Sequence, residues 1–336
     1  MIPDARPHDG RQGRHVARGL DPVALCAMLL ALAALSQTAA AQGYPSRPIR
    51  MVSASAAGSG SDVVLRLLSA RLSGNFGQQV VIDNRPGASG MIGAELTARA
   101  APDGHTLWLA TLTQLISTTL NNRLLLAKEF APVGLVATTP FIIVVSSALP
   151  VRSAAEFIAY VKSRPGELIF GSSGTGGATH VCIELFQSMA GLKMLHVPYK
   201  GMSGAITDIM AGQIHAACPA APTMTIFAGK VRVLGVTSLH ATPLAPGVPP
   251  ISDALPGYEI PGWYGLVAPL GTPKAIVARI NEVFAKTVNA PDVRERLLAA
   301  GAEPAMSSPE AFAAFLRKES DRLGKLLKDA GVGSTQ

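Results

Sequence analysis

The chain has 336 residues and a formal net charge of +7, and aromatic residues make up 5% of it. The basic residues are dispersed along the chain. The basic stripe with aromatic stacking platforms that marks a nucleic-acid-binding protein is therefore missing, and we expect no nucleic acid as a partner. A mildly basic protein instead favours an anionic solute.

The first 41 residues have the order of a secretory signal peptide. An apolar run covers residues 23–35, and small residues follow it at 39–41. The segment before the run is basic, since it contains Arg6, Arg11, Arg14 and Arg18. The run is shorter than the roughly 20 residues that a membrane-spanning helix needs. We therefore predict cleavage after Ala41 and a mature protein in the periplasm.

From Tyr44 onward, short apolar segments alternate with helical ones, which predicts an α/β fold with largely parallel strands. The predicted strands cover residues 49–53, 80–83, 107–110, 141–145, 168–171, 195–198, 214–218 and 231–237. The predicted helices cover residues 63–72, 91–100, 154–162, 179–189, 205–210, 274–288, 293–300 and 309–328. The strands are too short and apolar to lie outside a covered sheet. The stretch 242–261 is rich in Pro and Gly and is predicted to be a crossing or rim loop.

Two similar units of strand, small-residue loop and helix lie at residues 49–72 and 168–189. Their loops read S-A-A-G-S-G-S-D at 55–62 and G-S-S-G-T-G-G-A-T-H at 171–180. Glycine lets a backbone pass close to a ligand, and the first turn of a helix leaves N–H groups unpaired. Such a position accepts an anionic oxygen. Each loop alone could equally be an ordinary Gly- and Ser-rich turn without a ligand. Two matching loops in two lobes favour a binding cleft between them.

Several side chains near these loops have two interpretations. The hydroxyl groups that add uncharged donors belong to Ser55, Ser59, Ser61, Ser172, Ser173, Thr175 and Thr179. Asp62 either acts as an acid or caps the following helix, and capping is the favoured interpretation. Lys200 either contacts a ligand or faces solvent. Trp263 and Tyr264 either close over a ligand or pack at a junction between lobes.

Six motifs in fixed order carry a resemblance to a known family. They are Y-P-S-R-P-I-R at 44–50, D-N-R-P-G-A at 83–88, A-A-P-D-G-H-T-L at 100–107, F-A-P-V at 130–133, H-V-P-Y-K-G at 196–201 and W-Y-G-L-V-A-P at 263–269. With these motifs the chain resembles the tripartite tricarboxylate transporter receptors, also called Bug receptors, from Tyr44 to about Val332.

This resemblance implies a two-lobed, hinge-bending periplasmic binding fold in which each lobe is a mostly parallel sheet flanked by helices. One lobe is expected to combine residues 44–144 with 266–336, and the other, inserted lobe to cover 145–265. The implied function is that of a monomeric receptor without cofactor or enzymatic activity. It would bind a small carboxylate and deliver it to the membrane components of a tripartite tricarboxylate transporter.

The resemblance also implies the ligand contacts. Carried over to this sequence, they are Ser55, Ala57, Gly58, Ser59, Gly60, Ser61, Asp62, Thr111, Thr113, Ser172, Ser173, Gly174, Thr175, Thr179 and His180. The family usually has Pro-Phe where this chain has Ala54 and Ser55, so the first loop is more polar here. Many members carry Asp where this chain has Pro219. A plain carboxylic acid is therefore favoured over an amino acid, and Pro219 joins the predicted site.

Two other classes of function stay open, a secreted hydrolase and a metal-binding protein that use the same cleft. The sequence lacks G-x-S-x-G, H-E-x-x-H, a Walker A loop and a complete G-x-G-x-x-G, which argues against an enzyme. Metal binding would rest on His180 with Cys182 and on His215 with Cys218, but residues two apart on a helix point to different faces. Cys182 and Cys218 form either a disulfide or two separate buried thiols, and we expect the thiols.

Overall fold

The computed structural model describes residues 43–221 and 229–329. The predicted signal peptide at 1–41 lies outside the described residues. None of the helices within the two described ranges combines the length and apolar character that crossing a bilayer demands.

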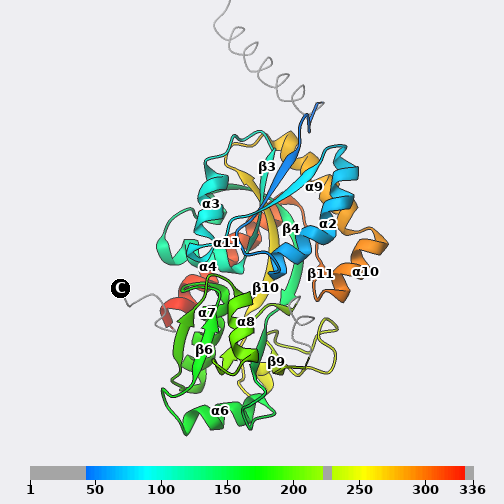
Figure 1. Cartoon of the computed structure of the whole chain (residues 1–336). Helices are drawn as coiled ribbons and strands as arrows, with labels where there is room; N and C mark the ends of the chain where they lie inside the picture. Colours follow the sequence, from blue (N-terminus) through cyan, green and yellow to red (C-terminus); the bar gives the residue numbers. More distant parts are fainter. Residues whose placement is uncertain (1–42, 222–228, 330–336) are drawn as a thin grey trace, which may run out of the picture. The chain divides into compact units, whose positions relative to one another are not determined.

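The first sheet has six strands in the order β11-β4-β10-β3-β1-β2 (Figure 1). Their bounds are β1 Ile49–Ser53, β2 Val80–Asn84, β3 Thr106–Thr111, β4 Phe130–Pro140, β10 Pro261–Pro269 and β11 Glu303–Pro304. Strand β1 pairs in parallel with β2 and β3. Strand β10 lies antiparallel between β3 and β4, and β11 is antiparallel to β4.

The second sheet has five strands in the order β7-β6-β8-β5-β9. Their bounds are β5 Ile142–Ser146, β6 Ile169–Ser172, β7 Leu195–Pro198, β8 Ala216–Ala217 and β9 Val231–Val236. Strand β6 is parallel to β7 and β8, whereas β5 is antiparallel to β8 and β9. The two-lobed α/β fold predicted from the sequence is confirmed, but both sheets are mixed rather than mostly parallel. Short apolar segments indicate burial and carry no information about strand direction.

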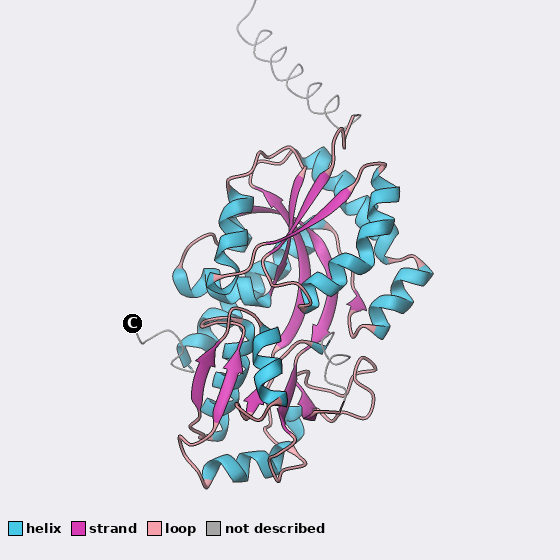
Figure 2. Cartoon of the chain, in the orientation of Figure 1, coloured by secondary structure: helices cyan, strands magenta, loops and turns pink. Residues whose placement is uncertain are grey.

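The alternation of side chains along its strands gives the first sheet two buried faces. On one face, Met51 and Leu109 pack with α2 (Gly60–Phe76), α9 (Lys274–Val288) and α10 (Pro291–Ala299). On the other face, Val52 and Trp108 belong to a core shared with the remaining helices of this lobe. These helices are α3 Met91–Ala98, α4 Leu112–Asn121, α5 Leu126–Glu129 and α11 Pro309–Asp329. Figure 2 shows helices on both sides of this sheet.

The second sheet is covered in the same way. Ile143 and Phe170 face α6 (Ala154–Lys162) and α7 (Ala178–Ala190). Ile142 and Val144 face α8 (Met202–Met210) on the opposite side. Two short 3-10 helices complete the described elements, η1 Ala88–Gly90 and η3 Ile251–Asp253.

The chain passes between the sheets twice, and the two crossings are hydrogen-bonded to each other. Phe141 lies between β4 and β5, and its N–H donates to Thr237 Oγ1 at 3.1 Å. The Thr237 hydroxyl in turn donates to the carbonyl of Ile260 at 2.8 Å, just before β10. The lobe boundaries predicted after residues 144 and 265 fall inside β5 and β10, each of which lies wholly within one sheet.

The structure overturns the expectation for the cysteines. Cys182 on α7 and Cys218 beside β8 form a disulfide with Cα atoms 6.3 Å apart. The prediction of two separate thiols is therefore wrong. The helix and strand that bring the two residues together are adjacent only in the folded lobe, which spacing along the sequence does not reveal.

Candidate functional site

A cavity of about 760 Å³ is lined by residues of both sheets and their connecting turns. Five of these turns lead from a parallel strand into a helix. They follow β1, β2, β3, β6 and β7. In α/β sheets, ligand crevices form outside the carboxyl ends of the strands, and here both sheets contribute to one crevice.

Five helices begin at this cavity, namely α2, α3, α4, α7 and α8. The first N–H groups of a helix have no helical carbonyl partner, and the helix dipole adds partial positive charge there. Ser59 is the N-cap of α2, and Thr111 forms a capping box with Gln114 at the start of α4. The lining is therefore rich in uncharged donors that suit an anion.

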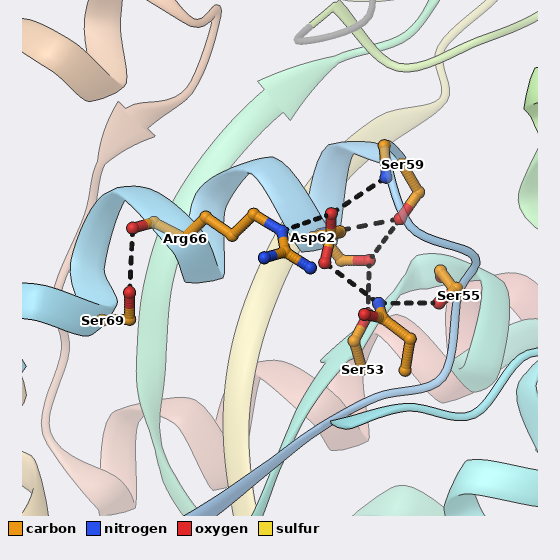
Figure 3. Close-up of polar contacts among 9 residues, drawn as sticks. Ser53, Ser55, Ser59, Asp62, Arg66 and Ser69 are labelled. Atoms are coloured by element: carbon orange, nitrogen blue, oxygen red, sulfur yellow. Dashed lines mark hydrogen bonds and ion pairs between the residues drawn. The ribbon is translucent and has the colours of Figure 1, made fainter. Parts of the chain in front are cut away.

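Asp62 stabilises the first loop but is not part of the cavity lining, and its side chain is 3% exposed. Its carboxylate accepts from the Gly58 N–H at 2.9 Å, from Arg66 Nε at 2.9 Å and from Asn84 Nδ2 at 3.0 Å. Figure 3 shows Asp62 between Arg66 and Ser59. Burial by itself raises the pKa of Asp62, but the hydrogen bonds from Arg66, Gly58 and Asn84 outweigh it and hold the pKa below its ordinary value.

The start of α2 differs from the prediction. The helix begins at Gly60 instead of residue 63, and Ser59 caps it by accepting from the Asp62 N–H. Asp62 lies in the first turn, so its predicted role as the cap is corrected to that of a brace for the Gly58 N–H. The run of Gly and Ser hid the start of the helix, because neither residue is a strong helix former.

The second loop is braced in a similar way. The Ser173 N–H donates to Thr179 Oγ1 at 2.9 Å, and the Gly176 N–H donates to His180 Nδ1 at 3.2 Å. The His180 ring lies behind this loop, with its centroid 4.1 Å from that of His196. His180 thus supports the loop and is not part of the lining.

Ser172 and His196 form the only hydroxyl–imidazole pair we find next to the described lining, with Oγ and Nε2 2.7 Å apart. Ser172 is fully buried and does not line the cavity, so its hydroxyl cannot reach a molecule there. Burial and the neighbouring His180 lower the pKa of His196 to about 4. The pair is therefore a buried structural contact in this geometry.

Turns from the two lobes touch across the cavity. The Ser89 hydroxyl after β2 donates to the Thr175 carbonyl at 2.6 Å. The Ala178 N–H at the start of α7 donates to Thr113 Oγ1 at 3.3 Å. These contacts join residues that are 86 and 65 positions apart in the chain.

Few charged side chains line the cavity. Within the described residues they are Glu95, Arg123 and Lys200. Arg123 donates to Glu95 at 2.9 Å, so these two charges compensate each other. Lys200 is exposed and leaves the lining with a positive excess.

The structure brings most of the predicted site residues to this cavity. Those in the lining are Ser55, Ser59, Gly60, Ser61, Thr111, Thr113, Ser173, Gly174, Thr175 and Thr179. Those outside it are Ala57, Gly58, Asp62, Ser172, His180 and Pro219. Pro219 contributes its carbonyl to the sheet, where it accepts from the Ile142 N–H at 2.9 Å.

Sequence reasoning missed the turns after β2 and β7 as parts of the site. Residues 86–91 and 198–202 line the cavity, although only Lys200 in these stretches was considered for a ligand contact. The usable signal was that these turns also connect a strand to a helix, as the two Gly-rich loops do. Gln114 and Ser117 gave no comparable signal, because their position depends on how the sheet and α4 pack. Tyr264, for which closing over a ligand was one of two interpretations, also lines the cavity.

The metal-binding alternative rests on His180 with Cys182 and on His215 with Cys218. No group of three or more His, Cys, Asp or Glu side chains within it is placed to hold a metal ion. Cys182 and Cys218 are joined to each other, so neither is free to act as a thiolate ligand.

Comparison with known proteins identifies the family. The family model for the tripartite tricarboxylate transporter family receptor matches residues 64–332. A UPF0065 protein from the tcbD-tcbE intergenic region of Pseudomonas sp. (strain P51) is 36% identical, with 91% of this chain and 94% of the relative covered.

Two similar solved structures contain a carboxylic acid. Rpa4515 of R. palustris with adipate has a TM-score of 0.80 and 34% identity, with 86% of this chain and 99% of that chain covered. MatC (Rpa3494) of Rhodopseudomonas palustris with bound malate has a TM-score of 0.79 and 29% identity, with 84% and 100% covered. On the evidence of its fold, its cavity and these matches, the chain belongs to the tripartite tricarboxylate transporter receptor family.

Proposed function

We propose that this protein is a periplasmic receptor that binds a small organic carboxylate in the cavity between its lobes. The observation that carries the proposal is the convergence of five helix starts, with their N–H groups and hydroxyls, on one cavity. Uncharged donors at helix N-termini stabilise an oxyanion without a paired cation. Adipate and malate, which similar proteins hold, are dicarboxylates of a size that such a cavity admits.

A plain carboxylic acid fits this lining better than an amino acid. Glu95 is the one acidic residue in the described lining, and Arg123 already pairs with it. An ammonium group would find no unpaired carboxylate among these side chains, and burying a charge without a partner is unfavourable.

In the proposed cycle, the two lobes close around the ligand by a hinge motion. The receptor then delivers the ligand to the membrane components of a tripartite tricarboxylate transporter. The hinge lies where the two crossings meet at Phe141 and Thr237. Closure is favoured when a ligand makes contacts that only both lobes together provide. In this proposal the protein is a monomer and catalyses no reaction.

A thermal-shift screen of mono-, di- and tricarboxylates, with aspartate and glutamate included, tests this function. A ligand that binds only the folded state raises the melting temperature in a concentration-dependent way. We expect at least one plain carboxylate to raise it more than either amino acid does. Stabilisation by amino acids alone, or by none of the acids, would contradict the proposal.

A further inference from the structure

Tyr264 lines the cavity, and its hydroxyl is a buried polar group. Tyr264 lies on β10 and is 3% exposed. No described residue forms a hydrogen bond with its hydroxyl. The neighbouring Thr139 hydroxyl donates to the Gly301 carbonyl at 2.8 Å, so it does not donate to Tyr264, although its oxygen can still accept. Burial raises the pKa of Tyr264, and Thr139 only partly opposes this, so the phenol stays protonated and remains a donor.

The hydroxyl points to the start of α2. A Cβ atom added to Gly60 would lie 2.4 Å from the Tyr264 oxygen, which leaves room for glycine alone. Gly60 and Ser61 form the first turn of α2, where N–H groups have no helical carbonyl to bond. The phenol and the helix start therefore present donors to the same corner of the cavity.

Two other buried aromatic residues show why this hydroxyl is exceptional. Tyr258 is fully buried, but its hydroxyl donates to the Cys182 carbonyl at 2.9 Å. Trp263, next to Tyr264 on β10, also lines the cavity and also has an unpaired ring N–H, but its ring packs against Phe312 and Phe315 in the other core. Among the three, the unpaired donor that lies beside Gly60 at the start of α2 is that of Tyr264.

A buried hydroxyl without a partner is unfavourable, so its retention indicates a partner that arrives with the ligand. We propose that the Tyr264 hydroxyl donates a hydrogen bond to an oxygen of the bound carboxylate, directly or through one water, beside the first turn of α2. This inference rests on the proposed function. The proposed hydrogen bond makes Tyr264 a specificity residue, because it favours ligands that place an oxygen atom beside the start of α2.

The test compares Tyr264→Phe with the matched control Tyr258→Phe. Each change removes one buried hydroxyl and keeps the ring. Calorimetry measures the affinity for adipate and malate, and thermal unfolding measures the stability of the ligand-free proteins. We expect Tyr264→Phe to weaken binding by about 10- to 100-fold, the effect of a hydrogen bond to a charged group. Its ligand-free melting temperature should be equal to or above that of the wild type.

Tyr258→Phe should show the opposite pattern, with a lower melting temperature and an unchanged affinity. Unchanged affinity of Tyr264→Phe would overturn the inference. A marked drop in its ligand-free melting temperature would also overturn it, because that result would reveal a partner within the protein.

Failure of the proposed function would look different. If the wild type binds neither acid nor any other carboxylate, the function is wrong, and a high-resolution structure of the ligand-free protein then decides the inference. An ordered water within about 3.2 Å of the Tyr264 oxygen would support a donor that is directed into the cavity. A hydroxyl bonded only to Thr139 would overturn it.

Discussion

Asp62 fixes the conformation of the first loop through its hydrogen bonds. Its buried carboxylate accepts hydrogen bonds from the Gly58 N–H on the loop, from Arg66 on α2 and from Asn84 on β2. Without it, the N–H of Gly58 and the amide of Asn84 would have to find other partners in a partly buried setting. The loop that lines the cavity is therefore held by a group outside the lining.

Replacing Asp62 with Asn should destabilise the protein by about 1–3 kcal/mol at pH 7, the range for losing a partner of buried polar groups. The folded-state pKa of Asp62 lies below the unfolded value of about 3.9, so its ionised form stabilises the fold above that pH. This contribution is lost as the pH falls through the folded-state pKa.

Urea unfolding of wild type and Asp62→Asn between pH 7 and pH 3 measures the difference. The difference in the free energy of unfolding between the two proteins should be largest at pH 7 and should shrink below about pH 4. Asp292→Asn is the matched control, because Asp292 pairs with Arg71 at the surface and is 56% exposed. Equal effects of the two variants at pH 7 would contradict the role given to Asp62.

At the scale of elements, the disulfide links α7, which begins at the cavity, to the residue that directly follows β8. It closes a loop across a sequence separation of 36 residues. Closing a loop of this length covalently stabilises the folded state by about 4 kcal/mol, because the unfolded chain loses conformational freedom. The disulfide thus contributes to fixing the second lobe's half of the site.

The double variant Cys182→Ala/Cys218→Ala should have a free energy of unfolding lower by about 4 kcal/mol. Urea unfolding with and without a thiol reductant provides the internal control. The reductant should destabilise the wild type and leave the double variant unaffected. A wild type that is insensitive to complete reduction would show that the bond does not contribute to stability.

Elements with a clear apolar pattern were predictable from the sequence. Helices 154–162 and 274–288 and strands 49–53 and 195–198 have their predicted bounds. Helix α4 was missed because L-T-Q-L-I-S-T-T-L-N is rich in Thr, Ser and Ile, which are moderate helix formers. Its Thr111–Gln114 capping box and its packing in the shared core stabilise it instead.

The same limit applies to the long antiparallel strands. Strands β4 and β10 pair with each other across the middle of the first sheet, although more than 120 residues separate Pro140 from Pro261. Local sequence does not encode such pairing, because register depends on the partner strand. The mixed direction of the sheets and the place of Tyr264 on β10 were therefore beyond prediction, although closing over a ligand was one of the two interpretations given to Tyr264. The two Gly-rich loops were predictable.

At the scale of the whole molecule, turns of the two lobes contact each other across the cavity. The Ser89 hydroxyl donates across it to the Thr175 carbonyl. Such contacts exist only when the lobes approach each other, so they favour the closed form over an open one.

Ser89→Ala should shift the equilibrium towards the open form. We expect affinity for the best carboxylate to fall about 2- to 10-fold, the effect of one neutral hydrogen bond. Small-angle scattering of the ligand-free variant should give a larger radius of gyration than that of the wild type. Ser69→Ala is the control, because the Ser69 hydroxyl donates to the Arg66 carbonyl within α2, away from the cavity lining. Identical scattering and affinity in Ser89→Ala and wild type would contradict a closing role.

The most direct measurement is a crystal structure of the protein with the carboxylate that stabilises it most. We predict carboxylate oxygens within about 3.2 Å of N–H or hydroxyl donors at the starts of both α2 and α7, one from each lobe. An acid bound away from these two helix starts, or a cavity that stays free of the acid at saturating concentration, would contradict the account.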